Sequence, residues 1–172
     1  MGFIKEKRIH IMKKHTEPLD IICHKIDYTG KNKGLGNAHT HGLEDYGKFN
    51  ICLGIDLSKK DTENILNTVA ELFCDPNEEF NVSLAHLVKD ENDGDWFAFY
   101  FQPVFCFEEP SFLIVLADEN GNFPEDKDCL EPYKSQLKNN HDIEFIPLKN
   151  GTVDFDAFTK RQQKMWDDYF EE

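Results

Sequence analysis

The chain has 172 residues, of which 40% are hydrophobic and 13% aromatic, and this composition excludes a disordered acidic chain and suffices for one hydrophobic core. Its 33 acidic and 19 basic residues give a formal net charge of −14 at pH 7, which disfavours binding to nucleic acids and to anionic membranes. The same charge suits a solvated surface or a contact with a basic protein partner.

The cysteines and the apolar runs bear on the cellular location of the protein. The five cysteines are odd in number and form no C-x-x-C pair, so we expect reduced thiols and a cytoplasmic location. The first residues lack the apolar stretch of a signal peptide, and no apolar run reaches the roughly 20 residues of a spanning helix. The cysteines are Cys23, Cys52, Cys74, Cys106 and Cys129.

The first third of the chain predicts three strands. Residues 1–18 suit a short helix or an extended arm, which Pro18 ends in either case. Residues 19–27 follow as a strand, and a loop rich in glycine and lysine comes next. Residues 38–43 and 49–55 then predict two neighbouring strands joined by a polar turn.

Residues 58–74 give the clearest helix signal. Ser58 is a favourable N-cap, and Asp61 suits the positive start of the helix. Apolar residues recur at helical spacing and predict one buried stripe. This stripe contains Ile65, Leu66, Val69, Leu72 and Phe73.

The rest of the chain predicts further strands and a second helix. We expect strands at 80–88, 96–101 and 112–117, separated by turns and by the region of Pro103 and Pro110, and a short strand at 143–147. Residues 118–133 are irregular, and Asp154 is the expected cap of an aromatic helix at about 155–170. The order predicts a single α+β domain over 1–172, with a mostly antiparallel sheet of about five to seven strands and helices on one face.

Two stretches carry a resemblance to a known family. The first reads AHTHGL over 38–43, followed by a turn with Gly47. The second is an apolar strand that runs into D-x-x-G-x-F-P, formed by Asp118, Gly121, Phe123 and Pro124. Over 36–137 the chain resembles small bacterial proteins catalogued as domain of unknown function 4262. The resemblance implies a shared fold and supplies no activity.

The histidine pair His39 and His41 is the main candidate for chemistry. Side chains two apart on a strand point to the same face, so both imidazoles can reach one metal ion. A third ligand would complete a site with an open position, and the candidates are His86, Glu44, Asp45 and Cys52. The alternative is two ordinary histidines at a polar strand end, hydrogen-bonded to the neighbouring turn.

Three other motifs favour structural roles. Cys23 and His24 face opposite sides of a strand and cannot easily pair, and Cys129 lies among carboxylates that oppose thiolate chemistry. The turn after Asp118 lacks the calcium-loop pattern, so we expect Gly121 at positive φ and Phe123 with Pro124 packed on the core.

The C-terminal helix at about 155–170 carries more aromatic side chains than one buried stripe needs. It either docks on the sheet of its own chain or contacts a partner or a second copy of the chain. Its aromatic residues are Phe155, Phe158, Trp166, Tyr169 and Phe170.

Two functions follow from these patterns. The first is a non-enzymatic, immunity-like interaction module that masks a basic protein, and it rests on the charge and on the lack of a catalytic motif. The second is an enzyme or ligand-binding protein that uses His39 and His41 at a cleft. The sequence predicts no cofactor, and a divalent metal ion is the alternative that belongs to this second function.

Overall fold

The computed structural model describes residues 7–12, 19–27, 36–76, 80, 84–90, 95–107, 109–137, 142–145, 148–149 and 152–153. These residues form one α+β domain with one α-helix, α1 (Lys59–Cys74), which confirms the predicted fold class. The expected C-terminal helix and its cap Asp154 lie outside the described residues. No helix in the described ranges is long and apolar enough to cross a membrane.

The described residues contain an eight-stranded sheet with the order β1-β5-β6-β7-β4-β3-β2, and β8 pairs with β6. Two pairs, β1 with β5 and β4 with β7, are parallel and the others are antiparallel. The strands are β1 (Lys7–Met12), β2 (Ile22–Asp27), β3 (Gly36–His41), β4 (Asn50–Leu53), β5 (Ala85–Asp90), β6 (Trp96–Cys106), β7 (Glu109–Leu116) and β8 (Ile143–Phe145). A separate hairpin joins β9 (Leu148–Lys149) to β10 (Thr152–Val153).

Several strands differ in extent from the sequence prediction, and three segments show this most clearly. The N-terminal segment, for which a short helix or an arm was expected, contributes β1 by pairing with β5. A strand was expected at 80–88, but the observed strand β5 begins at Ala85, and Phe80 lies before it. Pro110 lies inside β7 instead of before it, and Pro103 lies inside β6 instead of after it, so the predicted separating region belongs largely to the two strands. Pro103 is accommodated by its place in the sheet. It falls between the stretches that pair with β5 and with β8, so its missing N–H removes no bond on that side.

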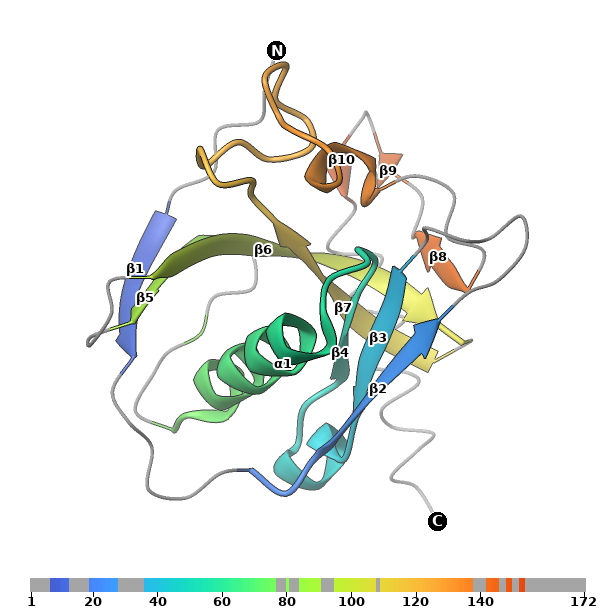
Figure 1. Ribbon diagram of the computed structural model, residues 1–172. Coiled ribbons are helices and arrows are strands. Elements are labelled where there is room, and N and C mark those ends of the chain that lie inside the picture. The colour runs from blue at the N-terminus through green and yellow to red at the C-terminus, as the bar shows by residue number, and fades with distance from the viewer. Residues whose placement is uncertain are drawn as a thin grey trace.

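The sheet curves around α1, which lies in its hollow (Figure 1). The predicted apolar stripe of α1 supplies buried side chains such as Leu66 and Val69, which pack in one core with alternate residues of β6 and β7. Within this core the rings of Phe101 and Phe112 are stacked with their centroids 5.0 Å apart. This helix face therefore follows from the periodicity of the sequence.

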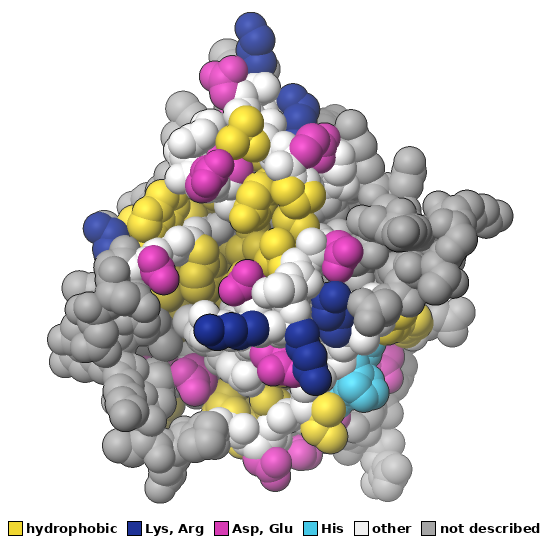
Figure 2. All heavy atoms as spheres, viewed as in Figure 1, with side chains coloured by type: hydrophobic (Ala, Val, Ile, Leu, Met, Phe, Trp, Pro, Cys, Tyr) yellow, Lys and Arg dark blue, Asp and Glu magenta, His cyan; other side chains and the backbone are white. Residues whose placement is uncertain are grey.

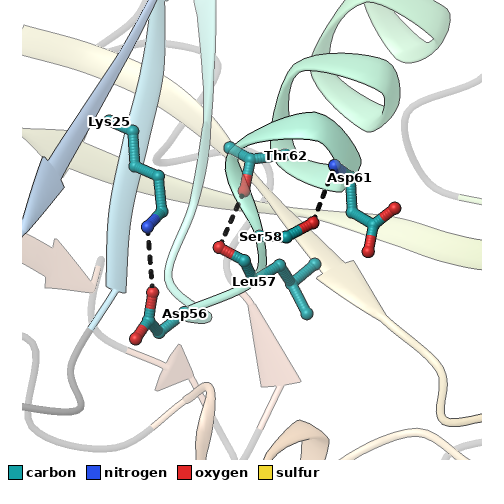
Figure 3. Close-up of polar contacts among 6 residues, drawn as sticks. All are labelled: Lys25, Asp56, Leu57, Ser58, Asp61 and Thr62. Carbon is teal, nitrogen blue, oxygen red and sulfur yellow. Dashed lines mark hydrogen bonds and ion pairs between the residues drawn. The ribbon is translucent and has the colours of Figure 1, made fainter.

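Polar contacts fix the start of α1 (Figure 3). The backbone N–H of Asp61 donates to the Ser58 hydroxyl over 3.1 Å, so Ser58 is the N-cap, as predicted. Lys25 of β2 forms an ion pair of 3.2 Å with Asp56, which ties an edge strand to the approach of the helix.

The opposite face of the sheet has its own core. Because side chains alternate along β6, Ala98, Tyr100 and Val104 point away from α1 and pack with Leu113 of β7. The irregular segment 117–137 covers this core with Phe123, whose ring centroid lies 5.0 Å from that of Tyr100. Among the described residues, this face is therefore covered by an irregular segment.

Candidate metal centre

Three histidines meet on the loop-covered side of the sheet, on neighbouring strands β2 and β3. The antiparallel register sets His24 directly opposite His39, and His41 lies two residues further along the same face of β3. One ligand nitrogen from each of the three rings lies within 4.8 Å of the others. The hairpin geometry alone therefore gathers three potential metal ligands.

The three rings pack edge to face. The centroids of His39 and His41 are 4.8 Å apart, and those of His24 and His41 are 4.9 Å apart, with interplanar angles of 87° and 82°. Zn–N bonds of about 2.0–2.1 Å in tetrahedral geometry place ligand nitrogens about 3.4 Å apart, so small side-chain rotations would bring these rings onto one ion.

The surroundings of His39 favour its neutral imidazole form, which is the form that binds metal ions. It is 9% exposed, and burial, followed by the charges of His41 and His24, lowers its pKa to about 4. Its Nδ1 lies 3.0 Å from Asn37 Oδ1, which can only accept, so Nδ1 carries the proton and the lone pair is on Nε2. Asn37 in turn donates to Cys106 Sγ over 3.8 Å. Such outer contacts orient metal-binding histidines in proteins.

A pocket of about 330 Å³ opens beside the cluster. The three histidines line it together with Phe107, whose ring centroid is 5.3 Å from that of His39 and whose φ is 48°. Further lining residues are Ile26, Thr40, Asn50, Cys106, Glu109 and Ser111. The pocket offers space next to the imidazoles for a water molecule and a small ligand, with a carboxylate and a hydroxyl on its wall.

The proposed third ligands lie elsewhere. Among the described residues, the metal-ligand cluster contains His24 in place of the four candidates chosen from the sequence. His86 is fully buried on β5, with its ring stacked 4.2 Å from that of Phe80. Glu44 accepts from the Gly42 N–H and, over 2.8 Å, from Asn50 Nδ2, so it holds the turn after β3.

The remaining two candidates are explained by their surroundings. Asp45 is exposed in the 3-10 turn η2 (Leu43–Tyr46). Cys52 lies opposite His39 on β4, but its thiol is fully buried and donates to Cys106, and this hydrogen bond together with burial raises its pKa. A buried protonated thiol is a poor metal ligand.

His24 was missed because the register of β2 against β3 is not visible in the sequence. In the sequence, the neighbour of His24 with reactive chemistry is Cys23, which faces the other side of the strand. An antiparallel hairpin of the two strands places His24 either opposite a histidine or on the other face, and a shift of one residue decides between them.

The second motif, from Asp118 to Pro124, forms a tight turn. Gly121 has φ 83°, and Phe123 is 7% exposed in the second core. Asp118 accepts backbone N–H groups of Asn120, Asn122 and Leu130. Burial alone would raise the pKa of Asp118, but these donations outweigh it and lower the pKa, so the carboxylate stays ionised.

Cys23 and Cys129, the two cysteines considered as nucleophiles, have the character of structural thiols. All five cysteines of the chain are free. Burial, followed by the charge of the Asp118 carboxylate, raises the pKa of Cys129 to about 11. Burial also raises the pKa of Cys23, with Glu63 adding to it. Neither thiol is therefore a nucleophile at neutral pH.

No protein-family model, curated protein or solved structure matches this chain. The resemblance to domain of unknown function 4262 therefore stays a prediction.

Proposed function

We propose that this protein binds a divalent transition-metal ion through His24, His39 and His41, and that zinc is the preferred ion. The convergence of three imidazoles within 4.8 Å carries this proposal. Imidazole nitrogens suit zinc, and three protein ligands leave its fourth position free. The neutral state of His39, with its proton directed to Asn37, supplies a lone pair without a deprotonation step.

A three-histidine site of this kind supports hydrolytic chemistry. Zinc with a free position lowers the pKa of a bound water to about 7 and so supplies a nucleophile at neutral pH. The chain contributes the Glu109 carboxylate and the Ser111 hydroxyl on the wall of the same pocket, where they can accept a proton and position a small polar substrate.

The test is metal content and zinc affinity of the purified full chain. We expect about one equivalent of zinc by elemental analysis, and we expect His24→Ala, His39→Ala and His41→Ala each to abolish it. Asn37→Ala removes the partner of His39 Nδ1 and should weaken zinc binding by about 10–100-fold, since losses of outer contacts have that size.

The matched control is His86→Gln, which changes a histidine outside the cluster. Circular dichroism must show that each variant is folded, and the control must retain zinc. Absence of zinc binding in a titration of the folded wild-type protein would overturn the proposal. Zinc binding by the three ligand variants that equals that of the wild-type protein would overturn it as well.

A second candidate function is the binding of a basic protein partner. The formal charge of −14 favours it, and so does a groove that carboxylates line beside the N-terminal part of α1. The expected contact through the C-terminal aromatic helix concerns residues outside the described part of the chain.

A further inference from the structure

A second, larger hollow lies beside the N-terminal part of α1, between the helix, the start of β6 and the turn that follows β7. Its volume is about 560 Å³, and it shares no described lining residue with the histidine pocket. Figure 2 shows hydrophobic side chains gathered in a hollow of this face, with acidic side chains at its margin. The lining residues are Leu57, Asp61, Asn64, Ile65, Thr68, Val88, Asp95, Trp96, Phe97, Leu116, Ala117, Asp118, Glu119 and Tyr133.

The floor of this acidic groove is apolar and includes an accessible indole. Trp96 is 44% exposed, although large aromatic side chains of a small domain are mostly buried. Its ring packs beside the turn after Asp118, since a Cβ atom added to Gly121 would lie 3.9 Å from Trp96 Cη2. Ile65 and Phe97 are half-buried in the same lining. An exposed indole on an apolar floor offers a stacking surface.

The charged side chains among the described lining residues are all acidic. Four carboxylates line the groove, and its described lining residues include no lysine or arginine. Burial, followed by the charges of Glu119, Asp61 and Asp118, raises the pKa of the Tyr133 phenol at this site. Asp118 is 2% exposed and held ionised by backbone N–H groups, so it contributes a fixed charge in the wall.

Resting on the second candidate function, we propose that this acidic groove binds an arginine-bearing segment of a basic protein. A guanidinium group stacks on an indole face and pairs with carboxylates at its edge, and its aliphatic stem covers apolar surface. Trp96 supplies the stacking face, and Asp61 and Glu119 are exposed carboxylates of the rim. A second copy of the chain is a poor occupant, because two chains with a formal charge of −14 repel each other.

The probe for this site is the peptide acetyl-Arg-Leu-Arg-Leu-Arg-amide, titrated into the full chain. The chain has two tryptophans, and a Trp166→Phe background leaves Trp96 as the reporter of fluorescence. Calorimetry of the wild-type protein measures the same binding independently. We expect saturable binding that changes Trp96 emission, and weaker binding of the peptide in which glycine replaces leucine, because that peptide covers less of the apolar floor.

Charge variants distinguish binding of the peptide in the groove from its attraction by the net charge of the chain. Asp61→Asn with Glu119→Gln removes two rim charges, and we expect the Kd to rise at least about tenfold. The matched control, Asp20→Asn with Asp45→Asn, removes two exposed charges outside the groove and should change the Kd less than about threefold. Trp96→Ala should weaken binding by about 3–30-fold through loss of stacking.

Two outcomes would overturn the proposal. Equal weakening in the two charge variants would show that the peptide follows the net charge and not the groove. A Trp96 signal that does not change while calorimetry detects binding would place the peptide elsewhere. Both measurements use metal-free buffer, so they are independent of the histidine site.

Discussion

The two faces of the sheet are closed by different physical means. The face towards α1 is a continuous aromatic and aliphatic core, and its stability comes from burial of apolar area. The other face is covered by the irregular segment 117–137, which two polar side chains, Asp118 and Gln136, tie to backbone groups. In the described part of the chain, the histidine cluster at β2 and β3 lies on this second face and is partly exposed. Apolar packing thus builds the scaffold, and a few specific hydrogen bonds shape the face that carries the histidine cluster.

The largest loss should come from the helix face. Phe99 is fully buried, and its ring contacts those of Phe101 and His86. We expect Phe99→Ala to lower the free energy of unfolding by about 3–5 kcal/mol, measured by urea denaturation, because it removes apolar contacts and leaves a cavity. Phe107→Ala, at a side chain that is 43% exposed, is the matched control and should cost below about 1 kcal/mol. Similar losses in both variants would contradict this account of the core.

Removal of the Asp118 carboxylate tests the other face. We expect Asp118→Ala to lower the free energy of unfolding by about 2–4 kcal/mol, because the N–H groups of Asn120, Asn122 and Leu130 lose their acceptor. The control Asp45→Ala removes an exposed carboxylate and should change stability by less than about 0.5 kcal/mol. The same denaturation curves measure both. A value for Asp118→Ala as small as that of the control would mean that the turn does not hold the segment.

Acid should weaken the same hydrogen bonds in the intact protein. The pKa of Asp118 is lower in the folded state than its unfolded value of about 3.9. The ionised carboxylate therefore stabilises the protein above that value, and this stabilisation is lost as the pH falls through the folded pKa. We expect the stability of Asp118→Asn to depend less on pH below about 4 than that of the wild-type protein. Parallel pH profiles would show that other groups control acid unfolding.

The difference between the faces also decides what the sequence could predict. The helix with its Ser58 cap and its stripe through Leu66 and Val69 was predictable, because the spacing of apolar residues encodes a buried face directly. The histidine centre was predictable only in part. The pair His39 and His41 lies two residues apart on one strand, whereas His24 joins them through the register of β2 against β3, which the sequence of the two strands does not reveal.

The pairing of β1 with β5 and the passage of β6 through Pro103 were also hidden from the sequence. Both depend on which strands become neighbours, and that arises from packing between distant segments. The acidic groove has the same origin. It combines α1, the start of β6 and the turn after β7, which lie far apart in the chain. Sequence periodicity thus predicts single elements, and it does not predict the sites that several elements form together.

The smallest expected effect comes from the helix cap, which makes the comparison sharper because the chemistry matches that of Asp118. In both places a side-chain oxygen accepts backbone N–H groups, but Ser58 is exposed and accepts the one from Asp61. After Ser58→Ala, water can replace the lost acceptor, so we expect a loss of about 1 kcal/mol in urea denaturation. Ser58→Asp keeps the cap and should retain most of the wild-type stability. If Ser58→Ala cost as much as Asp118→Ala, burial of the N–H groups could not be the reason that the loop-covered face is sensitive, and the proposed difference between the two faces would fail.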